Sequence, residues 1–337
     1  MRRVVLAVLA LFLFSLVAGS FIPRLPGSDR QQVFVVAKGE GSREIAYELE
    51  KEGIISLAAF FRLYVASTGI AAKLQAGEYL LSPSMSVVQI AGEMRQGRVI
   101  QEELTIIEGW NLRDIGYYLE NRGLFQAEEL HEVAGFPAVD YAKATDLPRP
   151  KDFSSQFPFL QDKPGAVGLE GYLFPDTYYL RSGDGVEGLV VSQLKNFQDK
   201  TSGLDLKGKN LFEVVTIASM LEKEVRTYED KRMVAGILYK RLEHGIPLQV
   251  DATVAYAVGK RGEAITKQDL QADSPFNTYK YPGLPLGPIA NPGIESIRAA
   301  LNPQDSPYLY YLSTPDGETI FSETLEEHNR AVGQHLR

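Results

Sequence analysis

A glutamate lies on the apolar side of a predicted helix in the segment LFEVVTIASMLEKEV, residues 211–225. At about 100° per residue, the apolar side chains of this segment form a stripe along the helix. Glu222 falls inside that stripe, between Ala218 and Val225, whereas Glu224 points well away from it. A carboxylate at a position where leucine would pack better suggests a chemical role.

A carboxyl group among apolar neighbours keeps its proton more readily than one in water. Such a group can deliver the proton to a leaving-group oxygen, as glycosidase acids do, and a positioned proton contributes about 10²–10⁴ in rate. Glu222 is therefore the best candidate for a catalytic acid. The alternative is a glutamate at the helix end that pairs with Lys223, Arg226 or Lys231.

Two further segments combine carboxylates with aromatic or hydroxyl side chains. GLEGYLFPDTYYL, residues 168–180, holds Glu170 and Tyr172 among aromatic rings, and such mixtures bind sugars by stacking and hydrogen bonding. The same segment could be an aromatic core hairpin. LQVDATVAYA begins a helix at Asp251 or Thr253 and leaves N–H groups available near an acid, although Asp251 could be a simple helix cap.

A third segment, NTYKYPGLPLGPIANPG, is rich in proline and glycine and carries Asn277, Tyr279 and Asn291. A rigid loop of this kind suits the wall of a ligand site, although it could also be an irregular crossing segment.

The sequence lacks the residue patterns that other kinds of catalysis require. The 4 histidines show no metal-binding spacing and there is no cysteine, so we expect neither a metal nor thiol catalysis. No nucleophile elbow, P-loop or dinucleotide-binding glycine pattern is present, so no cofactor is expected. The net charge of −8 argues against nucleic acid as a partner. Carboxylates and hydroxyls remain, and they suit glycoside chemistry.

The first residues, MRRVVLAVLALFLFSLVAGSFIPRLP, predict export of the chain. The apolar stretch at residues 4–23 is long enough to cross a hydrocarbon core of about 30 Å. Because Arg2 and Arg3 hold the N-terminus in the cytoplasm, we expect a single-pass anchor in the inner (cytoplasmic) membrane and a periplasmic or otherwise extracytoplasmic catalytic domain. A signal peptide cleaved near Ala18-Gly19-Ser20 is the alternative.

The rest of the chain predicts an α+β fold, because strands and helices are mixed without regular alternation. A strand–glycine turn–helix pattern at residues 33–54 returns at residues 104–124. The matching pairs are Gly39 and Gly109, Arg43 and Arg113, Ile45 and Ile115, Tyr47 and Tyr117, Leu49 and Leu119, Glu50 and Glu120, and Gly53 and Gly123. Residues 126–165 are predicted to be rich in loops, and Asp316-Gly317 predicts a hairpin turn.

Three regions follow from this organisation: a membrane anchor and linker (1–29), a small βα module (30–100) and a larger mixed α+β catalytic domain (101–337). In the small module, the segment GEYLLSP precedes a helix capped by Ser84 or Ser86. This helix resembles the serine-led helix of LysM-type glycan-binding modules. A small βα unit that only packs on its neighbour is an equally good reading.

Several segments, in order, resemble the YceG-like family of endolytic murein transglycosylases. They are EGYLFPDTY, ASMLEKE, YKRLEHGIPLQVDATVAYA, FNTYKYPGLPLGPIANPG, and AALNP followed by YLYYL. The resemblance covers most of the chain beyond residue 30. Met220-Leu221 stands where the family often has Ile-Val, and Ala252 where proline is common, and neither departure removes a chemical group.

The resemblance implies that the substrate is peptidoglycan, cut between N-acetylmuramic acid and N-acetylglucosamine. Glu222 would protonate the glycosidic oxygen, and the same carboxylate would then deprotonate the muramyl 6-hydroxyl, which closes onto C1 to leave a 1,6-anhydro end. Cell-wall synthases or division proteins are the implied partners. The residues expected to bind or orient the glycan strand are Glu170, Tyr172, Asp251, Thr253, Asn277, Tyr279 and Asn291.

Other functions stay open at this point. A conventional glycosidase would need a second carboxylate, and Asp251 or Glu170 could serve as one. A membrane-tethered scaffold that binds peptidoglycan without cutting it would tolerate the loss of the Glu222 carboxylate. An exported structural protein would use Glu222 only in an ion pair.

Overall fold

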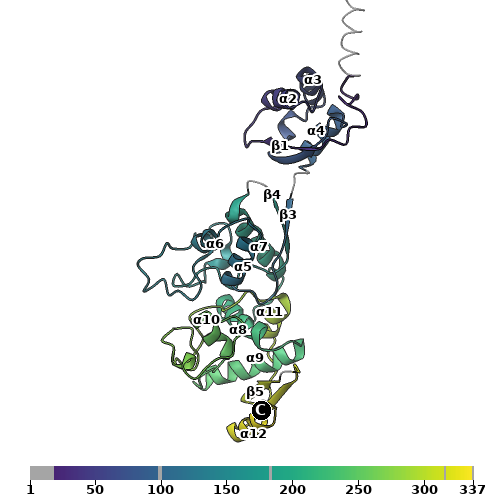
Figure 1. The fold of residues 1–337 in the computed structure, drawn as a ribbon. Coiled ribbons are helices and arrows are strands. Elements are labelled where there is room, and N and C mark those ends of the chain that lie inside the picture. The colour runs from purple at the N-terminus through teal and green to yellow at the C-terminus, as the bar shows by residue number, and fades with distance from the viewer. Residues whose placement is uncertain (1–18, 98–100, 182–183, 315, 336–337) are drawn as a thin grey trace, which may run out of the picture. The chain divides into compact units, whose positions relative to one another are not determined.

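The computed structural model describes residues 19–97, 101–181, 184–314 and 316–335 (Figure 1). It divides into two compact units, one within residues 1–103 and 179–185 and the other within residues 104–178 and 186–337. Strands β3 (Gln101–Thr105) and β4 (Thr177–Arg181) pair with each other, and the division passes through both. The domain boundaries expected from the sequence stay a prediction, because a geometric division does not show which segments fold independently.

The first unit is a small mixed fold with an antiparallel strand pair. Its elements are β1 (Gln32–Val36), α2 (Ser42–Lys51), α3 (Ala58–Ser67), η1 (Ala71–Lys73), β2 (Gly77–Leu81) and α4 (Val87–Gln96). Val33 of β1 lies opposite Leu80 of β2, and both are exposed, whereas the neighbouring Phe34 and Tyr79 are buried in the core. This alternation is that of a sheet with one buried face.

The predicted serine cap of α4 is Ser86. Its hydroxyl accepts from the backbone N–H of Gln89, and the Gln89 side chain accepts from the Ser86 N–H, which completes a capping box. A likeness of the first unit to a LysM module is not confirmed by this arrangement.

Most of the predicted membrane segment, residues 4–18, lies outside the described residues. Within the part of the chain that the structure describes, no helix combines the length and the apolar character that a membrane crossing requires.

The predicted repeat is confirmed in the secondary structure. Helix α2 has its counterpart in α5 (Leu112–Asn121), at the corresponding position of the second copy. The turn glycines Gly39 and Gly109 have φ of +87° and +80°, a region that side chains with a Cβ rarely adopt. The two copies therefore share their local backbone geometry as well as their sequence pattern.

Helices dominate the rest of the chain, which is of mixed α+β character. After α5, the helices are α6 (Ala127–Ala134), η2 (Pro158–Leu160), α7 (Gly185–Thr201), α8 (Leu211–Glu224), α9 (Tyr228–Glu243), α10 (Asp251–Val258), η3 (Asp269–Gln271), α11 (Ile294–Leu301) and α12 (Leu325–His335). Residues 126–165 are rich in loops, as the sequence predicts, and within them the structure assigns α6 and the short η2. Helix α6 packs on α5.

Helix α8 is central to the second unit and packs against α9, α10 and α11. Its residues from Val214 to Leu221 are all buried, including the polar Thr216 and Ser219. A helix that is buried on every side has no single core-facing stripe. The apolar stripe predicted from the sequence therefore does not distinguish an inward from an outward position at the end of α8.

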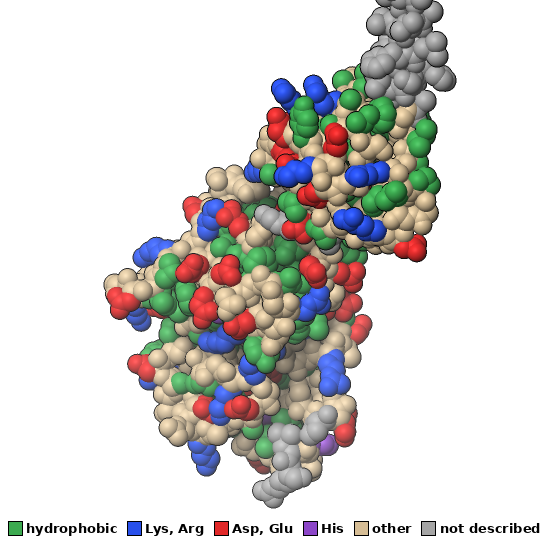
Figure 2. Space-filling view, turned by 45° about the horizontal axis from the view of Figure 1, so that its top comes forward, with side chains coloured by type: hydrophobic (Ala, Val, Ile, Leu, Met, Phe, Trp, Pro, Cys, Tyr) green, Lys and Arg blue, Asp and Glu red, His purple; other side chains and the backbone are tan. Residues whose placement is uncertain are grey.

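The predicted hairpin is confirmed. Strands β5 (Tyr310–Ser313) and β6 (Thr319–Ser322) pair antiparallel, with Tyr310 opposite Ser322, and α12 packs on both strands. On the face of the molecule shown in Figure 2, acidic and basic side chains are interspersed, so neither sign forms a continuous patch there.

Candidate active site

Two glutamates leave the last turn of α8 in different directions. Asn210 caps the start of the helix by accepting from the backbone N–H groups of Phe212 and Glu213, and the helix ends at Glu224. The last turn carries Glu222, Lys223 and Glu224. The two carboxyl groups meet different neighbours.

Glu222 is held by a complete set of polar partners. Its Oε1 lies 3.1 Å from Lys231 Nζ, and its Oε2 accepts from the Gly293 N–H at 2.9 Å and the Ser296 hydroxyl at 2.7 Å. The side chains of this ion pair are only 9% and 5% exposed. A buried pair with this many donors is a structural link between α8, α9 and the start of α11.

Glu108 approaches the same cluster. A Cβ at position 293 would collide with the Glu108 carboxylate, so Gly293 permits this close approach. Burial, with the Glu222 carboxylate nearby as a smaller cause, raises the pKa of Glu108. The expectation that Glu222 lies among apolar neighbours is wrong, because its surroundings are these charged and polar groups. Its catalytic role was predicted from those surroundings and from the resemblance to the YceG-like family, and it stays a prediction.

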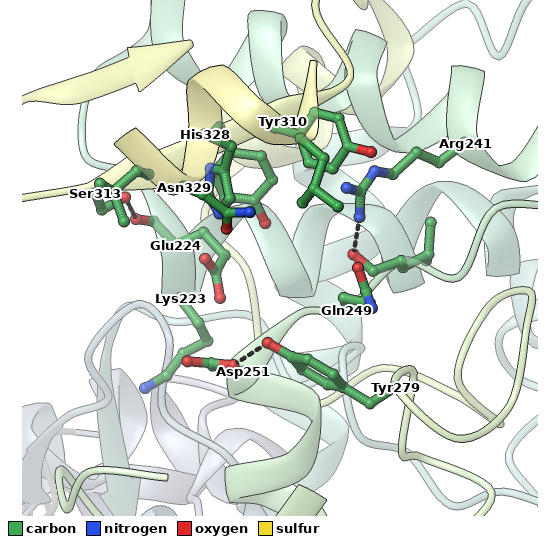
Figure 3. A pocket seen from close by; sticks show the side chains of 14 residues that line it. Lys223, Glu224, Arg241, Gln249, Asp251, Tyr279, Tyr310, Ser313, His328 and Asn329 are labelled. Atoms are coloured by element: carbon green, nitrogen blue, oxygen red, sulfur yellow. Dashed lines mark hydrogen bonds between the residues drawn. The ribbon is translucent and has the colours of Figure 1, made fainter. Parts of the chain in front are cut away.

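Glu224 lines a pocket of about 510 Å³, here called the Glu224 pocket (Figure 3). The walls come from the end of α8, the loop before α10, Tyr279, and the segment from β5 to α12. Figure 3 shows the Glu224 carboxylate and that of Asp251 on the same side of the pocket. A smaller pocket of about 280 Å³, lined by Glu222, Glu224 and Arg226 among others, adjoins the same helix end.

The surroundings of the Glu224 carboxyl group raise its pKa. Burial, followed by the negative charge of Asp251, raises its pKa to about 7, against the lowering effect of hydrogen bonds with the Ala252 N–H and the Tyr311 side chain. Within the described residues, no lysine or arginine forms an ion pair with Glu224. A carboxyl group that is about half protonated at pH 7 can both donate and accept a proton.

Asp251, the first residue of α10, lines the same pocket as Glu224. The phenol of Tyr279 donates to Asp251 Oδ1 at 2.5 Å, the bond that a dashed line marks in Figure 3. Asp251 is exposed to the pocket and does not cap α10, whose N-cap is Val250. The structure thus brings two of the sequence-predicted site residues, Asp251 and Tyr279, to the same pocket as Glu224.

The backbone next to Asp251 is unusual. Gln249, which also lines the pocket, has φ of +53°, a left-handed conformation that costs a non-glycine residue free energy. Arg241 holds this loop by donating from Nη1 to the carbonyl oxygens of Pro247 and Leu248, and from Nε to that of Leu309. A buried arginine therefore fixes both the loop before α10 and the strand β5 that carries Tyr311.

Three other predicted site residues, Glu170, Asn291 and Tyr172, are buried and do not line the Glu224 pocket. Glu170 accepts from the Leu112 N–H, the Tyr256 hydroxyl and Asn291 Nδ2, and burial raises its pKa to about 8. Asn291 Oδ1 in turn accepts from the N–H groups of Gly171 and Leu173. Tyr172 is also buried. These contacts join distant loops, and a direct contact of these side chains with substrate stays a prediction.

Thr253 and Asn277 are likewise buried, and the polar atoms of their side chains all have hydrogen-bond partners. The Thr253 hydroxyl donates to the Val250 carbonyl and lies 2.9 Å from the Thr278 hydroxyl. Asn277 Nδ2 donates to the carbonyls of Leu270 and Ala272, while its Oδ1 accepts from the Tyr279 N–H at 3.0 Å. Both residues shape the loop that presents Tyr279, and their binding role stays a prediction.

The sequence analysis placed Glu222 ahead of Glu224 and did not single out Tyr311, Arg241 or Gln249, which line the Glu224 pocket. The motif ASMLEKE contains both glutamates, so the signal was present, but helix periodicity ranked Glu222 higher. Among the described residues, no group of three or more histidine, aspartate or glutamate side chains could hold a metal ion.

Comparisons with known proteins identify a family and several relatives of this chain. The sequence model of the YceG-like family matches residues 34–334. An endolytic murein transglycosylase of Bacillus subtilis is 32% identical over 89% of this chain and 84% of its own length. One of Streptococcus pneumoniae is 30% identical over 96% of this chain, which spans 62% of that protein. The crystal structure of a YceG-like protein from Listeria monocytogenes is 31% identical, covers 90% of this chain and 99% of that one, and gives a TM-score of 0.56.

Proposed function

Because this chain belongs to the YceG-like family, we propose that it is an endolytic murein transglycosylase that cuts peptidoglycan strands with Glu224 as its acid and base. The observation that carries the residue assignment is the Glu224 carboxyl group, whose pKa is raised to about 7 inside an open pocket beside Asp251 and Tyr311. Glu222 fits the catalytic role less well, because its carboxylate is already bonded to Lys231, Gly293 and Ser296.

In the first step, protonated Glu224 gives its proton to the glycosidic oxygen between N-acetylmuramic acid and N-acetylglucosamine. The C1–O bond breaks and an oxocarbenium-like centre forms at C1 of the muramyl residue. The Glu224 carboxylate then accepts the proton of the muramyl 6-hydroxyl, whose oxygen closes onto C1. The product is a 1,6-anhydro end, no water is consumed, and Glu224 returns to its protonated form.

Asp251 assists in two ways. Its charge contributes to the raised pKa of Glu224, and a carboxylate in the same pocket stabilises positive charge that develops at C1. The hydrogen bond from Tyr279 holds the Asp251 carboxylate in place. If a water molecule reached C1 first, Asp251 could act as its base, and the reaction would be hydrolysis instead.

The test is a digest of purified peptidoglycan with the full chain in detergent, beside Glu224→Gln and Glu222→Gln variants, followed by mass spectrometry. We expect 1,6-anhydro ends from the unmodified chain and from Glu222→Gln, and none from Glu224→Gln. Reducing ends would show hydrolysis. Products lost only with Glu222→Gln would return the catalytic role to Glu222. Binding without products from any of the proteins would indicate a scaffold.

Further features of the proposal depend on sequence alone. Residues 4–23 would anchor the chain in the cytoplasmic membrane, and the first unit would act as a LysM-like module that binds glycan. Cell-wall synthases or division proteins would be its partners, as the resemblance to the family implies. Sedimentation of the chain with purified peptidoglycan, with and without residues 30–100, tests the binding role of the first unit.

A further inference from the structure

A second pocket adjoins the Glu224 pocket and carries an excess of positive charge. This Trp110 pocket, of about 280 Å³, is lined among others by Trp110, Asp114, Lys223, Tyr256, Lys260 and Arg261. Lys223 lines both pockets, and the neighbours Asp251 and Ala252 at the start of α10 line one pocket each. A group attached to a sugar in the Glu224 pocket can therefore reach into the Trp110 pocket.

The cations of the Trp110 pocket differ in how far they are neutralised. Lys260 forms an ion pair with Asp269 at 2.5 Å, and Arg261 forms one with Asp114 at 2.7 Å. Lys223 is exposed, and its Nζ donates to the Gly109 carbonyl at 3.2 Å, beside Trp110. Among the described residues it has no carboxylate within ion-pair distance. Its charge is thus available to a ligand.

Arg261 is held in a fixed position at the pocket. Its guanidinium lies 4.7 Å from the ring centroid of Tyr117 and bonds Asp114 through Nη2. One carboxylate occupies only part of the five donors of a guanidinium. Its side chain is 47% exposed, so the remaining donors can meet a second acceptor. Lys223 and Arg261 therefore present two cationic donor groups to the same space.

The aromatic wall adds a surface for a sugar or an apolar stem. Trp110 is the only tryptophan of the chain; it is half-buried and packs on Tyr118 with 5.2 Å between ring centroids. An indole face beside cations suits a ligand with an apolar face and a carboxylate. A neutral sugar alone would leave the charge of Lys223 unused.

On the basis of the proposed function, we propose that the Trp110 pocket is a subsite that recognises a carboxylate carried by the peptidoglycan strand, through Lys223 and Arg261. Two groups on the strand can supply this carboxylate. One is the free lactyl carboxylate of a muramyl residue without a peptide, and the other is a carboxylate of the stem peptide. Both groups are attached to the muramyl residue next to the bond that is cut.

The experiment measures binding separately from cleavage. The full chain carrying Glu224→Gln is titrated calorimetrically with four soluble strand fragments: peptide-free, peptide-free with the lactyl carboxylate converted to a methylamide, peptide-bearing, and peptide-bearing with its carboxylates amidated. We expect the preferred carboxylate form to bind about tenfold more tightly than its amide counterpart, as one charge-assisted hydrogen bond provides. The fragment pair that shows the preference identifies the source.

Variants assign the preference to the pocket. Lys223→Met and Arg261→Gln should each reduce the preference for the carboxylate, Arg261→Lys should retain part of it, and Lys267→Met, at an exposed lysine outside the described pockets, should leave it unchanged. Circular dichroism checks that each variant is folded. Equal binding of carboxylate and amide forms would overturn the proposal, and so would a preference that survives both Lys223→Met and Arg261→Gln.

Failure of the subsite and failure of the proposed function give different results. If the unmodified chain cuts peptidoglycan but binds carboxylate and amide fragments equally, only the subsite is refuted. If it shows the carboxylate preference but cuts no strand, the subsite stands and the enzymatic function is refuted.

Discussion

The two sides of the last turn of α8 show how one segment can place two glutamates in opposite roles. On one side, Glu222 meets Lys231, Ser296 and the Gly293 N–H, so its charge is neutralised within the protein. On the other side, Glu224 meets the like charge of Asp251 and opens into a pocket. The first arrangement compensates a buried charge, and the second is the one on which the proposed proton transfer depends.

The difference lies in which neighbours compensate the buried carboxyl group. Burial without a cation favours the protonated form, whereas a cation and two further donors favour the charged form. Both glutamates leave the same turn in different directions, and helix geometry alone does not show which direction meets compensating partners. Their partners come from the adjacent helix α9 and from α10, α11 and β5, which lie farther along the sequence.

The largest effect is expected from Glu224→Gln. Glutamine cannot donate a proton as an acid or take one as a base, so the rate of strand cleavage should fall by about 10²–10⁴. Anhydro-ended products are quantified by mass spectrometry at equal protein concentration. The matched control is Glu222→Gln, measured well below its melting temperature. Cleavage by Glu224→Gln within a few-fold of the unmodified chain would refute the assignment.

Glu222→Gln should act on stability instead. It leaves the Lys231 ammonium, only 5% exposed, without its carboxylate, and breaking a buried pair in this way costs about 3–5 kcal/mol. Urea unfolding measures the loss. Lys231→Met added to Glu222→Gln should restore part of the stability, because it removes the unpaired charge. Unchanged stability together with abolished cleavage would instead make Glu222 the catalyst.

This comparison also shows what the sequence could predict. The repeat around Gly39 and Gly109, the Ser86 cap and the hairpin at Gly317 depend on local rules, and the structure confirms them. The choice between Glu222 and Glu224 depends on which distant residues surround them. An apolar stripe identifies the inward side of a helix that has one buried side. It does not do so for α8, which is buried all round.

The buried polar residues illustrate a second limit. Glu170, Thr253, Asn277 and Asn291 were predicted to bind substrate because their side chains carry suitable groups. In the structure those groups bond to the backbone and to one another. Residue type shows which hydrogen bonds a side chain can form. Only the fold shows whether backbone groups or other side chains already form those bonds. Asp251 and Tyr279 differ because they lie at the rim of the Glu224 pocket.

The pH dependence of stability offers a further test of the Glu224 carboxyl group. The pKa of Glu224 is about 7 in the folded chain and near 4.5 when unfolded, so the folded state binds more protons between these values. Stability due to this group therefore falls as pH rises from 4.5 to 7. Glu224→Gln removes this effect and should gain up to about 3 kcal/mol over the unmodified chain across that range.

The measurement is urea unfolding of both proteins from pH 4 to pH 9, taking the difference at each pH. The buried Glu170 is present in both proteins, so its own titration cancels in the difference. Asp251→Asn serves as the control, because removing the neighbouring charge lowers the pKa of Glu224. The descending limb of cleavage against pH should then move to lower pH. A stability difference that does not vary with pH would contradict a raised pKa at Glu224.

The smallest effect is expected from Tyr279→Phe, which removes one hydrogen bond to Asp251 and leaves the aromatic ring. A hydrogen bond to a charged group contributes about 1.5–3 kcal/mol when fully buried, and less where solvent can replace it. Because Asp251 is exposed to the pocket, we expect kcat to fall about three- to tenfold, with KM for the strand little changed. Tyr281→Phe is the matched control, since Tyr281 bonds Asp273 outside the pocket. If Tyr279→Phe raised KM and left kcat unchanged, Tyr279 would contact the strand directly and would not act by positioning Asp251.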